Sequence, residues 1–359
     1  MIKLSRICSG KLALLTAVVC SFAQTPSIND GIVFSGTTRV TTTTTTTTNT
    51  ARPNSNCICV SQGTCLSPSA TTAVPSIDIR IVNQGQQSCP SGQVLCCGAS
   101  GSFTSSCGTR KITNSPAQGQ GIAKYGEYPW QVAILKPNNE YIGSGVLITS
   151  THILTAAHKV SSYSNLQFKV RLGDWNGIVD SEPYPYQEYY PLTVKIHENF
   201  NPSTLYNDIA VIKINGDVPL ASSPHINTAC LPTALPPVGT QCWVTGWGKN
   251  AFGPTGSYQS ILREVQVPII DQSVCENQLR NTRLGGLFYL DRMSFMCAGG
   301  EPGKDACTGD GGAPLVCLSS TQQWSVIGLV SWGIGCAQNI PGVYVNVVNY
   351  LPWIYQNIS

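Results

Sequence analysis

Charged side chains are scarce in this chain. They make up 11% of its 359 residues, which is about half the share found in an average soluble protein. Lys and Arg number 21 against 18 Asp and Glu, and a net charge of +3 spread over this length is too small to indicate nucleic-acid binding. No apolar run reaches the roughly 20 residues that span a bilayer. These absences exclude a charge-rich disordered chain, a nucleic-acid-binding protein and a multi-span membrane protein.

Turn-forming residues and cysteine are abundant instead. The 34 Gly and 23 Pro indicate many turns, which favours an all-β fold over a helical one. The 16 Cys are typical of an oxidising compartment if an export signal is present.

Residues 1–23 have the features of a secretory signal peptide. Lys3, Arg6 and Lys11 precede the apolar run 12–20, and small residues follow it. The alternative, a membrane anchor, needs a longer apolar run. Removal of this peptide takes three basic residues and two Cys, and leaves 18 basic against 18 acidic residues and 14 Cys. The mature protein is therefore formally neutral and is expected to be extracellular.

Two small regions follow the signal peptide. Residues 24–56 are rich in Thr, Ser, Pro and Asn, with eight Thr in a row at 41–48, and predict a disordered segment. The Thr run is either a carrier of O-linked sugar or an unmodified tail. Residues 57–97 hold six Cys and few large apolar side chains, so we expect a small module stapled by three disulfides. A zinc site is the alternative, but no His lies nearby.

Beyond a linker at 98–120, residues 121–359 are long enough for one large β domain. Short apolar-alternating runs between turn residues predict an antiparallel barrel or sandwich. Helical spacing of apolar residues at 347–358 predicts one terminal helix. The expected strands are 131–135, 145–154, 168–172, 209–214, 241–246, 264–270, 324–331 and 342–345.

Three short motifs in this domain carry the candidate chemistry. They are Leu-Thr-Ala-Ala-His at 154–158, Asn-Asp-Ile-Ala-Val at 207–211 and Gly-Asp-Gly-Gly-Ala-Pro-Leu-Val-Cys at 309–317. In this order they resemble the His, Asp and Ser boxes of the trypsin-like serine proteases. Further matching landmarks are 126–130, 245–248, 331–333 and 341–344. The resemblance covers residues 121–359 and implies two packed six-stranded β-barrels.

Gly311 stands where this family has its nucleophilic Ser. In the triad mechanism the Ser hydroxyl attacks the carbonyl, His takes its proton and Asp orients the His. Glycine has no side-chain oxygen, so no acyl-enzyme can form. By the resemblance, neither Thr308 nor Ser331 has the geometry of a substitute nucleophile. His158 and Asp208 are then remnants of a triad, and the protein is not expected to be an enzyme.

Two further departures from the family accompany the loss of Ser. Relatives have a Cys after the catalytic His, paired with one on the preceding strand. Here Lys159 takes the first place, and Gly143 or a neighbour takes the second. At the usual activation site the chain has no basic residue at 116–119, and the nearest candidate, at 111–112, is five residues too early. Asp310, which pairs with the new amino terminus in active relatives, is expected to lack that partner.

The residues that form the substrate-recognition pocket match the family pattern more closely than the nucleophile position does. Asp305 matches the Asp that binds Arg or Lys at the base of a trypsin-like pocket, and Gly333 and Gly342 match the small residues that keep it open. The amides of Gly309 and Gly311 match an oxyanion hole. One interpretation is that the pocket binds a basic side chain at Asp305 without cutting the chain that carries it. The other is that Asp305 is inherited and binds nothing.

No cofactor is expected. A weak resemblance to a calcium loop rests on Asp174, Asp180 and Glu182, but a calcium site needs six or more oxygen ligands and only these three residues are candidates.

The six-Cys module together with Gly at the Ser position resembles the clip-domain serine protease homologues of arthropods. The sequences at 303–312 and 283–285 are similar to the subgroup that serves as a cofactor in prophenoloxidase activation. The resemblance implies a secreted haemolymph protein of the melanisation pathway of innate immunity. Its implied partners are prophenoloxidase or its activating clip-domain protease. An upstream trypsin-like protease would cut it, and self-association after cleavage is left open; no nucleic-acid or membrane partner is expected.

Related homologues are cut at an Arg-Ile inside the clip domain, and Arg80-Ile81 lies in the long loop between the third and fourth clip Cys. We take it as the activating cleavage site; an ordinary pair of strand residues is the alternative.

Spacing alone does not choose among the pairings of the six clip Cys. The family's pattern implies seven disulfides with no free thiol. The implied pairs are Cys57–Cys96, Cys59–Cys89, Cys65–Cys97, Cys107–Cys230, Cys242–Cys317, Cys275–Cys297 and Cys307–Cys336.

The interpretation is a secreted, catalytically inactive protease homologue that works by binding. One alternative is an active trypsin-like endopeptidase, which Gly311 disfavours. Another is a microbial-surface recognition or adhesion protein that uses the barrel face or the clip domain.

Overall fold

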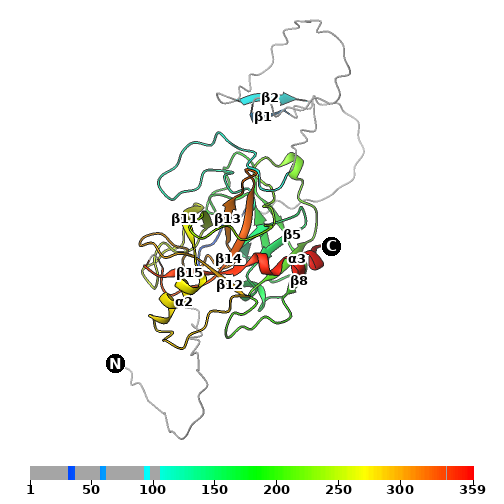
Figure 1. Ribbon diagram of the computed structural model, residues 1–359. Helices are drawn as coiled ribbons and strands as arrows, with labels where there is room; N and C mark the ends of the chain where they lie inside the picture. Colours follow the sequence, from blue (N-terminus) through cyan, green and yellow to red (C-terminus); the bar gives the residue numbers. More distant parts are fainter. Residues whose placement is uncertain (1–30, 37–56, 62–92, 98–105, 337) are drawn as a thin grey trace, which may run out of the picture. The chain divides into compact units, whose positions relative to one another are not determined.

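The computed structural model describes residues 31–36, 57–61, 93–97, 106–336 and 338–359 (Figure 1). The predicted signal peptide, the Thr run and the Arg80-Ile81 site lie outside these residues. So do the side chains of the clip Cys, and the three clip disulfides stay predictions. In the clip region, β1 (Cys57–Ser61) pairs antiparallel with β2 (Gln93–Cys97).

The first half of the large domain is a seven-stranded antiparallel sheet in the order β7-β6-β3-β4-β5-β9-β8. Its strands are β3 (Gln131–Leu135), β4 (Tyr141–Leu147), β5 (His152–Thr155), β6 (Lys169–Leu172), β7 (Gln187–Tyr189), β8 (Pro191–Ile196) and β9 (Ala210–Ile214). The two outermost strands, β7 and β8, are separated in sequence by Tyr190 alone. One bent stretch of chain thus pairs with both ends of the sheet and wraps it into a barrel of six strand positions.

The second half is a closed barrel in the order β10-β11-β12-β15-β14-β13. Its strands are β10 (Gln241–Gly246), β11 (Arg263–Ile270), β12 (Phe295–Gly299), β13 (Pro314–Leu318), β14 (Trp324–Trp332) and β15 (Pro341–Asn346). The all-β prediction is confirmed.

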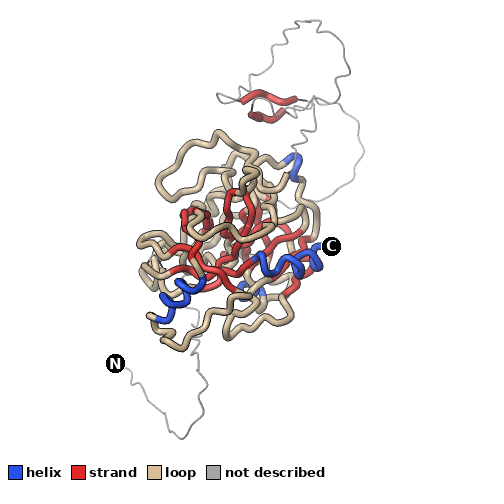
Figure 2. Tube along the Cα trace, viewed as in Figure 1, coloured by secondary structure: helices blue, strands red, loops and turns tan. Residues whose placement is uncertain are grey.

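Helices are few and short (Figure 2). They are α1 (Ala157–Val160), α2 (Gln272–Arg280), α3 (Leu351–Ile358) and the 3₁₀ turns η1 (Leu220–Ser222) and η2 (Val347–Tyr350). The helix expected at 347–358 begins as η2 and continues as α3.

The strand expected at 145–154 is wrong as a single element. The chain turns between β4 and β5, where the amide of Ile148 donates to the His152 carbonyl and the Thr151 amide donates to the Thr149 hydroxyl. The β-branched residues of this turn continue the apolar alternation, so the pattern did not reveal the turn.

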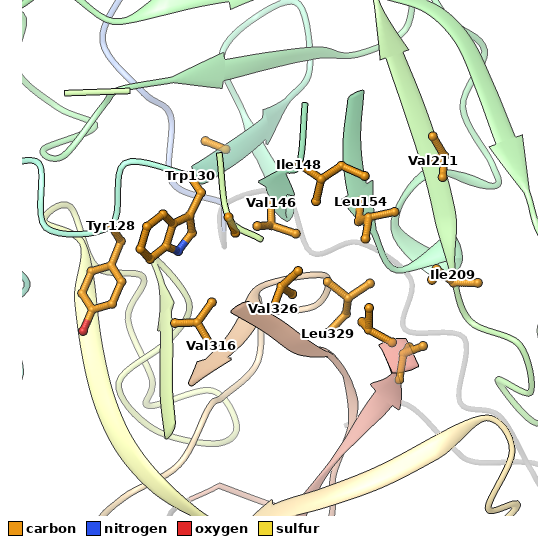
Figure 3. Packing of buried hydrophobic residues seen from close by; sticks show 14 of the residues in the cluster. Tyr128, Trp130, Val146, Ile148, Leu154, Ile209, Val211, Val316, Val326 and Leu329 are labelled. Carbon is orange, nitrogen blue, oxygen red and sulfur yellow. The ribbon is translucent and has the colours of Figure 1, made fainter. Parts of the chain in front are cut away.

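The main hydrophobic core lies between the two barrels. Figure 3 shows Val146 and Leu154 of the first sheet facing Val326 and Leu329 of the second, with Trp130 beside them. All five side chains are buried. Gln131 adds a polar link across this interface: its side-chain oxygen accepts from Thr245 at 2.7 Å, and its amide nitrogen donates to Ser144 at 3.0 Å. The two barrels therefore share one core.

Four of the implied disulfides are present: Cys107–Cys230, Cys242–Cys317, Cys275–Cys297 and Cys307–Cys336. The first ties the linker to the barrels. Within the described part of the chain, no helix has the length and apolar character needed to cross a membrane.

Leu329→Ala should lower the free energy of unfolding by about 2–5 kcal/mol, because it removes a fully buried side chain from the core that joins the barrels. Leu166→Ala is the matched control, since Leu166 is 76% exposed, and it should change stability by about 0.5 kcal/mol or less. Denaturant unfolding with the disulfides intact measures both. Equal effects of the two variants would contradict this account of the core.

Candidate functional site

His158 and Asp208 meet because their strands are paired. Thr155 at the end of β5 lies opposite Ala210 at the start of β9, so α1 and the turn before β9 share one edge of the sheet. The His158 Nδ1 donates to the Asp208 Oδ2 at 2.7 Å, and the His158 backbone amide donates to Oδ1 at 2.8 Å. The base and its orienting carboxylate are therefore still assembled.

Ser331 completes the surroundings of Asp208. Its hydroxyl, on β14, donates to the Asp208 Oδ2 at 2.7 Å, and the carboxylate is fully buried. The hydroxyl of Ser331 is thus committed to Asp208 rather than aimed at a substrate beside His158. Sequence reasoning considered Ser331 as a substitute nucleophile and missed this hydrogen bond.

The loop at 309–312 brings Gly311 against His158. The carbonyl of Gly311 accepts from the Ser144 amide at 3.0 Å, and the Gly312 amide donates to the Val330 carbonyl at 2.8 Å. A Cβ added to Gly311 would lie 2.7 Å from the His158 Nε2. Gly311 therefore occupies the position from which a nucleophilic hydroxyl would face the base, and it has no hydroxyl.

Lys159 fills space beside the same glycine. A Cβ at Gly311 would lie 2.8 Å from the Lys159 Cδ, and a Cβ at Gly143 would collide with the Lys159 Cε. The lysine stem therefore lies across the two positions that lack a side chain. Burial lowers the pKa of Lys159, and the carboxylates of Asp310 and Asp208 oppose that shift. Sequence reasoning identified the missing disulfide here, but not the lysine that takes its place.

Asp310 is held by backbone amides. Its Oδ1 accepts from the Gly248 amide at 2.8 Å and its Oδ2 from the Cys307 amide at 2.9 Å. Burial raises the pKa of Asp310 to about 6. It also lines a cavity of about 790 Å³ along which the uncut linker passes at 117–122. The amides of Gly248 and Cys307 thus satisfy both carboxylate oxygens of Asp310.

A second cavity, of about 170 Å³, collects the residues predicted for recognition. Asp305, Gly309, Gly311, Gly333 and Gly342 line it together with His158 and Lys159. A Cβ at Gly342 would lie 3.3 Å from the Asp305 Oδ1 and from the Tyr344 hydroxyl, so a side chain at this position would crowd both groups. Binding of a basic side chain at Asp305 stays a prediction.

The three residues that weakly resemble a calcium loop contact protein groups in the structure. Asp174 forms a buried ion pair with Arg171 at 3.0 Å, and the Glu182 Oε1 accepts from the amides of Trp175 and Asn176. Asp180 accepts from Ser35 at 2.6 Å. Among the described residues, no cluster of three or more His, Cys, Asp or Glu could hold a metal ion.

Gly311→Ser should not restore hydrolysis. The new Cβ would lie within 2.8 Å of both His158 and Lys159, so the hydroxyl cannot take the geometry of a nucleophile-base pair without displacing one of them. Labelling by a fluorophosphonate probe measures this, with trypsin as the positive control. Rapid labelling of the variant would show that Lys159 does not obstruct the site.

Glu182→Gln tests how the ionisation of Glu182 makes the free energy of unfolding depend on pH. Burial, followed by the charge of Asp174, raises the pKa of Glu182 from 4.5 to about 7. The ionised form therefore costs stability, and the cost grows as pH rises from about 4.5 to 7. We expect the variant to match the wild type near pH 4.5 and to exceed it by roughly 1–2 kcal/mol at pH 8, allowing for partial solvent screening. Denaturant unfolding at several pH values measures the difference, and a pH-independent difference would contradict the prediction.

The comparisons with known proteins agree with this geometry. A family model described as Trypsin matches residues 118–354. Inactive CLIP domain-containing serine protease A3 of Aedes aegypti is 46% identical over 327 residues, which are 85% of this chain and 68% of that protein. Phenoloxidase-activating factor 2 of Galleria mellonella is 44% identical over 256 residues, 67% of this chain and 83% of that protein. Inactive CLIP domain-containing serine protease A8 of Anopheles gambiae is 39% identical over 247 residues, 66% of each chain.

The family model covers well over half of the chain, and two of these three relatives are named as inactive proteases. The geometry agrees with those names, because the His-Asp pair of this chain faces a glycine. The chain is a clip-domain serine protease homologue, a non-catalytic member of the trypsin family.

Proposed function

We propose that this protein is a binding cofactor in the proteolytic cascade that activates prophenoloxidase. The observation that carries the proposal is a trypsin-like domain whose fold is intact while its catalytic centre has Gly311 in place of a nucleophile and the Lys159 stem beside it. Four disulfides and a shared core keep the domain rigid, so it can present a surface without performing chemistry. The similarity to a protein named phenoloxidase-activating factor 2 supports the choice of cascade.

The proposed partners are prophenoloxidase or its activating clip-domain protease, encountered in haemolymph. Disulfide bonds suit an extracellular compartment. We further propose that an upstream trypsin-like protease activates the cofactor by cutting after Arg80. In the sequence that bond lies between Cys65 and Cys89, in a stretch predicted to be a loop. With the predicted clip disulfides, a cut there would alter the clip domain without separating the chain into free halves.

A reconstituted assay tests the function. Purified prophenoloxidase and its activating protease are incubated with and without this protein, cut or uncut, and phenoloxidase activity is followed by dopamine oxidation. The cut protein should raise the activity at least several-fold over the protease alone. Arg80→Gln should abolish the increase, because a trypsin-like protease no longer cuts there, whereas the matched control Arg80→Lys should retain it. No increase with either form would refute the cofactor role, and full activity of Arg80→Gln would refute the cleavage site.

A further inference from the structure

Six residues from the segment predicted to be disordered are packed on the barrel domain. Residues 31–36 run antiparallel to the chain before β4, where Val33 lies opposite Glu140. The Tyr141 amide donates to the Ile32 carbonyl, and the Phe34 amide donates to the Asn139 carbonyl, both at 2.9 Å. The segment thus adds a short strand to an exposed turn, which is how extended peptides commonly bind β proteins.

Phe34 is the side chain that enters the domain. It is 1% exposed, while its neighbour Val33 is 55% exposed. Its ring stacks on Tyr141 with centroids 5.6 Å apart and meets the edge of Trp247 at 5.5 Å. A single buried aromatic ring with an exposed neighbour is the pattern of an anchor residue in a peptide complex.

The pocket for this ring is built by the barrel domain. A Cβ on Gly177 would lie 2.6 Å from Phe34 ring atoms, so the absent side chain of Gly177 makes room for the ring. The Arg171 guanidinium lies 5.6 Å from the ring centroid, and its side chain is fully buried in ion pairs with Asp174 and Glu188. Phe34 therefore packs, together with Tyr186, against the guanidinium of a buried charge network.

The anchor Phe34 lies just before the stretch of chain that carries the clip region. Residues 37–105, which include the Thr run and the clip region, follow it directly. The far end of that stretch is fixed to the barrels by Cys107–Cys230. Both ends of the clip-bearing stretch are thus attached to the same domain.

We propose that the barrel domain carries a docking site for an extended peptide with an aromatic anchor, that its occupant is the chain's own residues 31–36, and that this site retains the N-terminal segment when the chain is cut within residues 37–56. The site requires neither prophenoloxidase nor cleavage at Arg80, so it can fail or hold independently of the proposed function.

The test uses the full chain with a recognition sequence for a site-specific protease inserted between Thr44 and Thr45 and a fluorophore on the N-terminal side of Gly31. After cutting, the label should elute with the barrel domain in size-exclusion chromatography. Phe34→Ala should release the label, with at least a tenfold faster dissociation. Val33→Ala is the matched control and should retain it, because that side chain points mostly into solvent.

Gly177→Ala tests the site from the other side. It should release the label as Phe34→Ala does, since the added methyl occupies the place of the ring. A synthetic peptide of residues 31–36 added to the cut wild-type protein provides a measurement that does not depend on a barrel substitution: excess peptide should displace the label, and the same peptide with Ala for Phe34 should not. Immediate release from the cut wild type, or retention by Phe34→Ala, would overturn the proposal.

Discussion

The packing of the two barrels against each other is the constraint on which the rest of the structure depends. The side chains between them form one core, and Gln131 bridges that interface through Ser144 and Thr245. His158 and Asp208 come from the first barrel, whereas Gly311 and Ser331 come from the second. The site exists only because the packed barrels bring these residues together, so an intact fold keeps the outline of the site even without a nucleophile.

The catalytic centre differs from that of an active protease at more than one position. Gly311 removes the nucleophile, and the stem of Lys159 lies over both Gly311 and Gly143. Asp310 rests on backbone amides beside an uncut linker. A hydroxyl added at Gly311 alone would therefore lie against the Lys159 stem, which occupies the space beside this glycine. Asp208 is fully buried and satisfies its oxygens through hydrogen bonds from His158 and Ser331, which is a physical reason for the His-Asp pair to persist.

Many of the strands and several site residues could be predicted from the sequence, whereas one helix and the contacts of Lys159 could not. The strands at 131–135 and 241–246 were predicted with their observed bounds, because turn residues delimit them. The helix α2 was missed although Asp271 caps it by accepting from the amides of Ser273 and Val274, since its polar residues hide the apolar spacing. The role of Lys159 could not be read at all, because it depends on contacts with residues far away in sequence. The docking of Phe34 could have been suspected from the sequence, because residues 32–34 are the one run of three large apolar side chains within 24–56. The polar composition of the rest of that segment favoured disorder instead.

The central claim is that a trypsin-like domain with this site binds without cutting. The most direct measurement is hydrolysis of an arginyl chromogenic substrate by the purified protein, uncut and cut after Arg80, beside a His158→Ala variant prepared in the same way. The account predicts that the wild type and the variant show the same background rate in both forms. Hydrolysis by the wild type that the His158→Ala substitution removes would contradict it.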